Sequence, residues 1–265
     1  MESALADLCV EVTGNGRSVL FLHGSGSSRR SFDPQVAWLA DRYRCLVWDA
    51  PGYGESGEPR FAPSLADYAR CVRAVIDVVG GVEAVHLVGV SWGGLVAIEA
   101  ASRWPNSFAS LALIGPGFGD AARPDAAARN RARLAKFSRS KTSYVADRIQ
   151  LLSRGNPDSA VYRRVASNML NSTRSPGFDY ALQTMLTSDG RETASALNLP
   201  LSLMWGSDDP VAGDNCREMA ARLPAIMTFE IPDASHLANQ DQPHIVNQHL
   251  HTFWQHVSTR PASTH

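Results

Sequence analysis

The sequence predicts an α/β fold in which a mostly parallel central sheet is flanked by helices and interrupted by a helical insertion. Short apolar runs alternate with longer helical patterns along the chain, as expected of strand and helix units in a parallel sheet. Several of these runs are apolar at nearly every position, which is typical of strands buried on both faces. From about Gly119 to Ala196 the strand runs stop and the pattern becomes helical.

The individual elements are expected in chain order. The opening LCVEVTGNGRSVL predicts a β-hairpin that turns at Gly14, Asn15 and Gly16. The strands expected after this turn are SVLFL, RCLVWD, AVHLVGV, LALIG, LPLSLMWG and AIMTFEI. The helices expected between and after them are SFDPQVAWLADRY, SLADYARCVRAVIDVVGG, GGLVAIEAASRWP and a last helix from Pro243 to Val257. The tail STRPASTH is expected to be frayed.

The helical insertion determines the expected domain organisation. A chain of 265 residues can form one large domain that carries an insertion. We expect residues 1–118 and 197–265 to form the core. Residues 119–196 are expected to form a helical cap, or lid, inserted into that core.

Composition excludes several classes of protein. Hydrophobic residues make up 44% of the chain and charged residues 19%, as in ordinary globular domains. The net charge of −1 gives no reason to expect nucleic acid or an anionic membrane as a partner. The sequence contains neither a secretory signal pattern nor an apolar run of transmembrane length. The cysteines are far apart and are expected to be buried free thiols; they are Cys9, Cys45, Cys71 and Cys216. We therefore expect a cytoplasmic monomer or homodimer that acts on a small-molecule substrate.

The stretch VGVSWGG places Ser91 between an expected strand and an expected helix. Residues 89–93 match G-x-S-x-G, the motif of a nucleophile elbow in this strand-turn-helix setting. A serine on so sharp a turn is strained, and chains passing close by leave room only for glycine two residues to either side. The motif therefore predicts an exposed nucleophilic hydroxyl rather than an ordinary turn that contains serine.

A serine hydroxyl becomes nucleophilic when a base removes its proton and a third group orients that base. The loop GSDDPV follows the strand LPLSLMW and places Asp208 and Asp209 at its carboxyl end. The loop DASHL follows the next expected strand and places His236 there. The order serine, aspartate, histidine is the order of the triad in α/β-hydrolases.

With these motifs, the chain resembles the α/β-hydrolase superfamily over nearly its whole length. The HGxG loop of the family appears as His23-Gly24-Ser25-Gly26, and its D-x-x-G-x-G-x-S turn appears at residues 49–56. The resemblance implies the α/β-hydrolase fold and a catalytic triad of Ser91, His236 and an aspartate. It also implies an oxyanion hole formed by the backbone N–H groups of Ser25 and Trp92.

The resemblance also favours one aspartate over its rivals. The acid of the family usually lies three residues after the glycine of the turn, which from Gly206 is Asp209. Asp208 is then expected to cap backbone amides of the turn. The family uses a second acid position after the strand that follows the nucleophile helix, and there only Asp120 is near. We do not favour Asp120 as the catalytic acid.

Two further patterns indicate neither a cofactor nor a metal. Residues 52–57 match G-x-G-x-x-G, but Pro59 and Pro63 follow in place of the helix that a dinucleotide site requires. Histidines are frequent near the C-terminus, but no cysteine or carboxylate completes a ligand set with them; they are His244, His249, His251 and His256. We expect no cofactor and no metal.

The predicted function is that of a serine hydrolase that cleaves an ester-like carbonyl of a small, largely apolar molecule through an acyl-enzyme. Serine at the elbow argues against the haloalkane dehalogenase and epoxide hydrolase branches, which use a carboxylate nucleophile. The resemblance leaves open a carboxylesterase, a lactonase, a thioesterase, a C–C bond hydrolase and a peroxidase-like or lyase activity. A peptidase is less favoured, because that branch tends to carry HGGPG. A different class, a ligand receptor of the same fold with slow or lost hydrolysis, is also open.

The expected cap is basic. Residues 119–196 contain 13 Lys and Arg against 7 Asp and Glu, whereas the rest of the chain contains 12 against 19. One interpretation is a solvated basic face, with residues 129–141 forming an exposed helix. The alternative is a cap that closes over Ser91 with one arginine facing inward, which would favour substrates that carry a carboxylate. The apolar pocket would then be lined by aromatic residues from the set Phe137, Tyr144, Tyr162, Phe178 and Tyr180.

Overall fold

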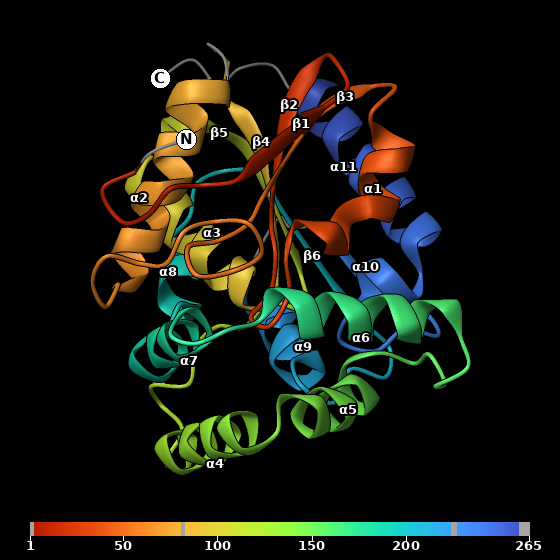
Figure 1. Ribbon diagram of the computed structural model, residues 1–265. Helices are drawn as coiled ribbons and strands as arrows, with labels where there is room; N and C mark the ends of the chain where they lie inside the picture. Colours follow the sequence, from red (N-terminus) through yellow and green to blue (C-terminus); the bar gives the residue numbers. More distant parts are fainter. Residues whose placement is uncertain (1–2, 81–82, 224–226, 260–265) are drawn as a thin grey trace.

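A seven-stranded sheet forms the centre of the computed structural model, which describes residues 3–80, 83–223 and 227–259 (Figure 1). The strand order within these residues is β1-β3-β2-β4-β5-β6-β7. Every neighbouring pair is parallel except β1 and β3. The strands are β1 (Val10–Thr13), β2 (Arg17–Leu22), β3 (Tyr43–Trp48), β4 (Val85–Val90), β5 (Phe108–Ile114), β6 (Leu201–Gly206) and β7 (Met227–Ile231).

Helices cover both faces of this sheet. Figure 1 shows α2 and α3 on one face and α1 and α11 on the other. The helices are α1 (Asp33–Leu39), α2 (Leu65–Val75), α3 (Trp92–Arg103), α4 (Ala126–Arg139), α5 (Lys141–Leu152), α6 (Ala160–Ser172), α7 (Gly177–Thr187), α8 (Arg191–Ser195), α9 (Gly213–Arg222), α10 (Ala238–Asp241) and α11 (Pro243–Thr259), with short η1 (Arg29–Phe32), η2 (Ile76–Gly80) and η3 (Pro105–Ser107). Among the described residues, no helix is long and apolar enough to cross a membrane.

The predicted fold class is confirmed. Strands β4 and β6 are buried at every position, as their nearly continuous apolar sequences indicate. The expected strand AIMTFEI begins at Ala225 and Ile226, which lie outside the described residues, and its remainder forms β7. The predicted last helix extends to Thr259, and residues 260–265 of the predicted frayed tail lie outside the described residues. Cys45, Cys71 and Cys216 are buried free thiols, whereas Cys9 is partly exposed.

The predicted N-terminal hairpin is wrong. The chain does turn at Gly14 and Gly16, which both have positive φ angles, but β1 pairs with β3 and not with β2. Strand β2 is buried at five of its six positions and is apolar on both faces, so it takes a parallel neighbour on each edge, β3 and β4. Strand β1 is partly exposed, with Glu11 only partly buried and Val12 and Thr13 exposed, and it forms the edge of the sheet.

Serine caps begin three of the helices. The hydroxyl of Ser64 accepts from the N–H of Asp67, whose side chain accepts from the N–H of Ser64 in return, at the start of α2. Ser140 and Ser159 cap α5 and α6 in the same position. Each cap satisfies a backbone donor that the first turn of a helix leaves free.

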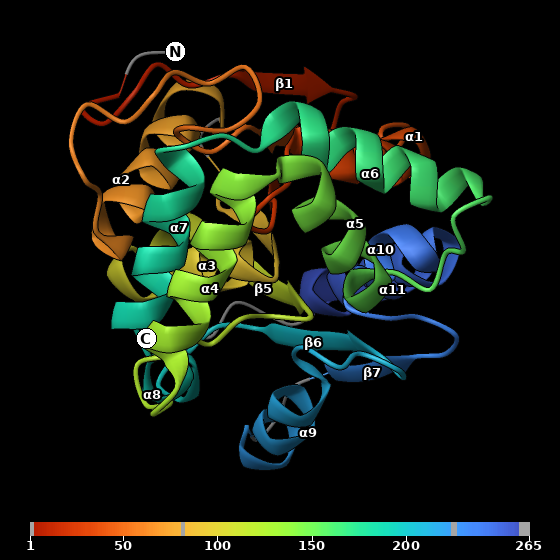
Figure 2. The same ribbon diagram turned by 60° about the horizontal axis from the view of Figure 1, so that its bottom comes forward.

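The segment between β5 and β6 forms helices α4 to α8, and α4, α5 and α6 lie beyond the carboxyl ends of the strands (Figures 1 and 2). The two ends of this segment are joined by hydrogen bonds: Asp120 N–H donates to Met185 C=O at 2.7 Å, and Gly190 N–H donates to Phe118 C=O at 2.6 Å. A Cβ on Gly119 would lie 2.0 Å from the Ser188 carbonyl oxygen. The insertion therefore leaves and re-enters the core at one place.

Helix α3 approaches the sheet so closely that two positions have no room for a side chain. A Cβ on Gly93 would lie 2.2 Å from the carbonyl oxygen of Leu22 and 2.6 Å from that of His23. A Cβ on Gly89 would lie 2.6 Å from the carbonyl oxygen of Gly93 and 2.6 Å from Cα of Gly94. These backbone contacts explain why the chain has glycine on both sides of Ser91.

Gly93→Ala is therefore expected to lower the free energy of unfolding by about 1–3 kcal/mol or more, because the backbone of β2 must move to admit the methyl group. Chemical denaturation measures this change. Gly213→Ala is the matched control: its Cβ would lie 3.4 Å from the nearest atom, Nη1 of Arg217, at the first residue of α9. The control is expected to change stability by less than about 0.5 kcal/mol. Equal losses in the two variants would contradict the packing explanation.

Candidate active site

Ser91 lies between β4 and α3 with a left-handed backbone conformation. Its φ is 53° and its ψ is −120°, in a region that non-glycine residues rarely occupy. Three hydrogen bonds hold this conformation: Ser91 N–H donates to Ile114 C=O at 3.0 Å, and its C=O accepts from Gly94 N–H and Gly117 N–H, both at 2.9 Å. The turn is thus fixed by β5, by α3 and by the loop that follows β5.

The sheet brings Ser91, His236 and Asp209 together from loops that follow β4, β7 and β6. The Nε2 atom of His236 lies 2.9 Å from Oγ of Ser91. Its Nδ1 atom lies 3.0 Å from Oδ2 and 3.2 Å from Oδ1 of Asp209. These contacts form one continuous path of hydrogen bonds from the serine hydroxyl to the carboxylate.

The backbone around Asp209 favours its charged form. Its Oδ1 accepts from Val211 N–H at 2.8 Å and from Ala212 N–H at 2.9 Å. Burial opposes the charge, but the hydrogen bond and charge of His236 together with these two amides lower the pKa of Asp209 below its usual value. Gly115, with φ of 49°, provides space for the pair, since a Cβ there would lie 3.3 Å from both Oδ2 of Asp209 and Nδ1 of His236.

The two rival aspartates lie elsewhere. Asp208 forms ion pairs with Arg154, which also lies 3.7 Å from Asp233. Asp120 lies 3.4 Å from Arg123 and lines the cavity described below. Of the three candidates, only Asp209 contacts His236 among the described residues.

Two backbone N–H groups lie beside Ser91 without a protein acceptor. Among the hydrogen bonds of the described residues, none uses the N–H of Ser25 or of Trp92. Trp92 is the first residue of α3, where the helix dipole adds positive potential. The loop of Ser25 lies against Ser91, because a Cβ on Gly24 would be 3.1 Å from Cβ of Ser91. Such donors can stabilise an oxyanion.

His23 holds this loop in place. Its Nε2 accepts from Ala50 N–H at 3.0 Å, so its Nδ1 carries the proton and donates to Gly24 C=O at 2.9 Å. Burial lowers the pKa of His23, despite the opposing effect of Asp49. The neutral ring thereby connects the loop that follows β2 with the loop that follows β3.

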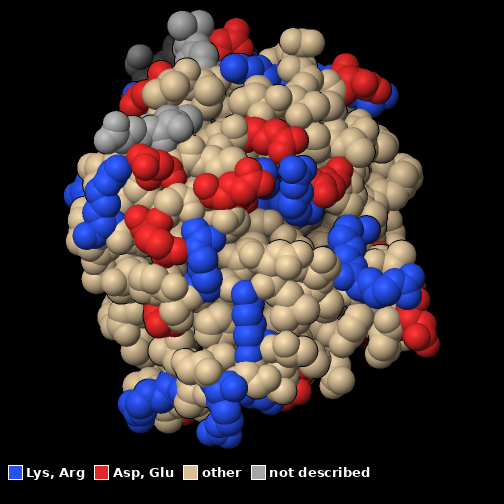
Figure 3. Space-filling model, viewed as in Figure 1, with Lys and Arg blue, Asp and Glu red and all other residues tan. Residues whose placement is uncertain are grey.

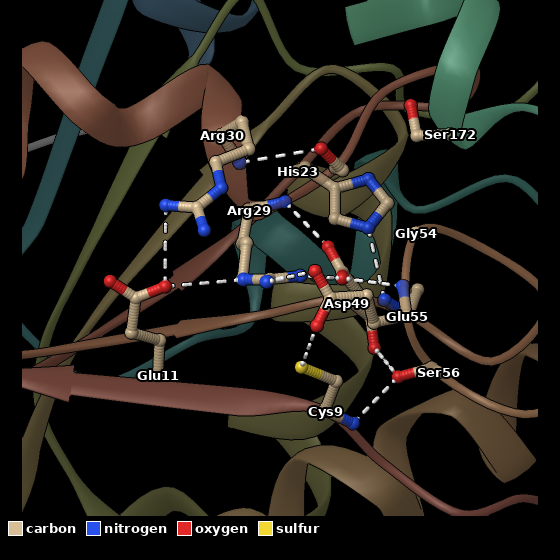
Figure 4. A network of polar contacts seen from close by, with 12 residues as sticks. Cys9, Glu11, His23, Arg29, Arg30, Asp49, Gly54, Glu55, Ser56 and Ser172 are labelled. Carbon is tan, nitrogen blue, oxygen red and sulfur yellow. Dashed lines mark hydrogen bonds and ion pairs between the residues drawn. The ribbon is translucent and has the colours of Figure 1, made fainter.

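A buried ion pair fixes the loop that follows β3 (Figure 4). Asp49 pairs with the guanidinium of Arg29 and also accepts from Arg29 N–H at 2.8 Å and Glu55 N–H at 2.9 Å. Arg29 also pairs with Glu55 at 2.6 Å and with Glu11 at 3.3 Å. Gly54 must lack a side chain, because a Cβ there would lie 2.2 Å from Oδ2 of Asp49. The G-x-G-x-x-G match is therefore part of a structural turn that no helix follows directly; α2 begins at Leu65.

A cavity lies above Ser91 between the core and the insertion. Its floor includes Ser25, Ser91 and His236. Part of its wall comes from the insertion, which contributes aliphatic and methionine side chains: Leu152, Val165, Met169, Leu182 and Met185. Four arginines also line it: Arg123, Arg129, Arg133 and Arg148.

This wall differs from the aromatic one expected from the sequence. Of the five aromatic residues, Tyr144 lines the cavity. Phe137 and Phe178 pack on Tyr144, with ring centroids 5.6 Å and 5.5 Å away, and join the helices to one another. Tyr162 and Tyr180 are partly buried outside the lining. The aromatic rings stabilise the insertion because α4, α5 and α7 bury them against one another.

The loop that carries His236 is also bonded to the insertion. Leu237 N–H donates to Leu152 C=O at 2.8 Å, and Oγ of Ser235 donates to Leu151 C=O at 3.1 Å. The carboxylate of Asp241 accepts from Ser235 N–H at 2.9 Å, and it also accepts from the hydroxyl of Ser153 and the N–H of Arg154 at 2.5 Å and 3.1 Å. Sequence reasoning missed Asp241, which belongs to no motif.

Two of the C-terminal histidines have partners that hold them in the fold. His249 stacks on Phe229 with ring centroids 3.8 Å apart, and Nδ1 of His251 lies 3.0 Å from the hydroxyl of Tyr43. Among the residues that the structure describes, no three His, Cys, Asp or Glu side chains gather as they would around a metal ion.

Known proteins resemble the chain over most of its length. A model of the alpha/beta hydrolase family matches residues 19–249. A 3-oxoadipate enol-lactonase from Acinetobacter baylyi is 29% identical over 245 residues, which are 89% of this chain and 88% of that relative. A pimeloyl-[acyl-carrier protein] methyl ester esterase from Chromobacterium violaceum is 30% identical over 93% of this chain and 99% of its own. The solved structure of a thermophilic esterase from Thermogutta terrifontis, with malate bound, is 26% identical and has a TM-score of 0.84 over 96% of this chain and 95% of its own. The chain therefore belongs to the alpha/beta hydrolase family.

Proposed function

We propose that the protein is a serine hydrolase that cleaves an ester-like carbonyl of a small molecule. The observation that carries this proposal is the path of hydrogen bonds from Ser91 through His236 to Asp209. Ser91, at one end of this path, lines a cavity. Esterases and a lactonase among the relatives support the same reaction class. The proposed steps use side chains and backbone amides alone.

In the first half of the proposed reaction, Oγ of Ser91 attacks the carbonyl carbon while Nε2 of His236 takes its proton. The Nδ1–H group of His236 donates to Asp209, which stays charged and stabilises the imidazolium. The N–H groups of Ser25 and Trp92 stabilise the negative charge on the former carbonyl oxygen. His236 then returns its proton to the leaving alcohol, and an acyl-enzyme forms on Ser91.

In the second half, water replaces the alcohol. His236 removes a proton from the water as its oxygen attacks the acyl-enzyme, and then protonates Oγ of Ser91 as the acid leaves. The net reaction adds one water to the ester and gives an acid and an alcohol.

Residues 119–196 act in this proposal as a cap. They supply part of the cavity wall and exclude water from the reacting carbonyl. Through the carbonyl groups of Leu151 and Leu152 they also hold the loop that carries the base.

A lactone is the second candidate substrate. It is a cyclic ester that the same steps would open, with the leaving alcohol still attached to the acyl group. The enol-lactonase among the relatives favours this candidate over C–C bond cleavage. A receptor without turnover is disfavoured by the intact hydrogen-bond path at Ser91.

Ser91→Ala is expected to lower kcat by a factor on the order of 10⁴ to 10⁶, because it removes the nucleophile of a positioned triad. Hydrolysis of p-nitrophenyl esters measures the loss, and a fluorophosphonate probe should label the original protein but not the variant. His244→Ala, at an exposed position in α11, is the control and should keep full activity. Retention of a tenth of the activity in Ser91→Ala would rule out the assigned nucleophile.

Asp209→Asn is expected to reduce kcat by about 10⁴, because the neutral amide no longer holds His236 in its working tautomer. Asp208→Asn is the matched neighbour, since its carboxylate is half-exposed and pairs with Arg154. It should alter kcat by less than about threefold, as expected for the loss of a surface ion pair. Steady-state kinetics of the two variants, with circular dichroism to verify folding, separate them; a larger loss for Asp208→Asn would refute the assigned acid.

A further inference from the structure

The cavity wall above Ser91 carries more positive charge than its neighbours neutralise. Arg123 precedes α4, Arg129 and Arg133 lie one turn apart on α4, and Arg148 lies on the neighbouring α5. Asp120 is the one acidic residue among the described residues that line the cavity. Figure 2 shows α4 and α5 next to each other.

The arginines fall into two pairs. Arg123 lies 3.4 Å from Asp120 and Arg129 lies 3.9 Å from Asp125, so a carboxylate accompanies each. For Arg133 and Arg148, no carboxylate in the described part of the chain lies within ion-pair distance. Both of these arginines are half-buried. A cation that is partly desolvated and unpaired destabilises a protein, and a bound anion offsets that cost.

The other basic residues of α4 behave differently. Lys and Arg side chains gather over the lower end of the molecule, where α4 lies (Figure 3). On α4, Arg131 and Arg139 are exposed and do not line the cavity, and Lys136 pairs with Asp147. The basic character of the insertion therefore has two parts, a solvated outer face and an inner pair formed by Arg133 and Arg148.

The surroundings of this inner pair suit an anion. Burial and the guanidiniums of Arg148 and Arg129 lower the pKa of Arg133, despite the opposing effects of Tyr144 and Asp120. Burial also raises the pKa of Tyr144, against the effect of Arg148 and Arg133. The Tyr144 phenol therefore stays protonated and can donate a hydrogen bond on the same wall.

We propose that the substrate carries a carboxylate that binds to Arg133 and Arg148 while its ester carbonyl lies at Ser91. This inference rests on the proposed serine hydrolase and names the class of its substrate. The guanidinium fork matches a planar carboxylate, and Tyr144 supplies a further donor. The apolar wall suits a hydrocarbon chain that connects the carboxylate to the ester; it includes Leu152, Val165 and Met185.

The test compares two esters of equal acyl length, the mono-p-nitrophenyl ester of glutaric acid and p-nitrophenyl pentanoate. The protein is expected to prefer the carboxylate-bearing ester by about tenfold or more in kcat/KM, as charged hydrogen bonds provide. The preference should decrease as salt is raised. The proposal would be overturned if the two esters had equal kcat/KM values at both low and high salt. It would also be overturned if the protein preferred an analogue that ends in a phosphonate to the one that ends in a carboxylate.

Variants locate the effect. The double variant Arg133→Gln, Arg148→Gln is expected to lower the ratio of kcat/KM for the carboxylate-bearing ester to kcat/KM for the neutral ester by about tenfold. Arg131→Gln, on the outer face of α4, should leave kcat/KM for both esters unchanged. Arg148→Lys keeps the charge and should retain part of the preference, and it serves if the double variant fails to fold. An unchanged ratio in a folded double variant would overturn the proposal.

Binding separates this inference from the proposed reaction. Calorimetry with glutarate should show a loss of affinity of about tenfold or more in the double variant relative to the original protein. This measurement does not depend on turnover. If the protein binds glutarate through the arginines but hydrolyses neither ester, the proposed hydrolase is refuted and the anion site is supported. If it hydrolyses both esters but does not bind glutarate, only the anion site is refuted.

Discussion

The close contact between α3 and β2 is the constraint on which the candidate site depends. Only a glycine at position 93 lets the helix approach the carbonyl groups of Leu22 and His23. This approach forces β4 and α3 to join through one left-handed residue, Ser91, whose hydroxyl is then presented beyond the end of the sheet. The same contact places the first N–H of α3 beside the loop that follows β2. The position of the Ser91 hydroxyl and that of the two backbone donors beside it thus result from one packing arrangement.

The position of His236 depends on contacts from two sides. On the core side, Gly206 lets the end of β6 lie against the loop of His236, because a Cβ there would be 2.2 Å from the Ser235 carbonyl oxygen. On the other side, the last carbonyl groups of α5 and the carboxylate of Asp241 hold the same loop. A displacement of the insertion would break these bonds, so the wall of the cavity and the position of the imidazole are mechanically linked.

The sequence predicts what depends on neighbours along the chain, and it fails where distant elements decide. Strands buried on both faces have a nearly continuous apolar pattern. The resemblance to α/β-hydrolases, counted from Gly206, favours Asp209, which is the aspartate that contacts His236. The two glycines at residues 14 and 16 predict a turn correctly, but nothing local indicates that β3 would lie between β1 and β2. Likewise, residue type suggests aromatic rings for a pocket, whereas the packing of α4, α5 and α7 buries Phe137 and Phe178 against one another. Asp241 acts through contacts with residues distant in the sequence, and therefore has no sequence pattern.

Charge distribution links the insertion to selectivity. The net charge of −1 is the sum of a basic insertion and an acidic core. Burial in the structure distinguishes the arginines that water screens from those that face the cavity. A guanidinium on the outer face is solvated and contributes little to binding. Inside the cavity, apolar walls reduce screening, so the same charge interacts more strongly with an anion. Keeping Arg133 and Arg148 partly desolvated costs stability in the free protein, and a ligand that neutralises them returns that free energy on binding. The arrangement therefore discriminates through the charge of the substrate while its apolar wall accepts the remainder of the molecule.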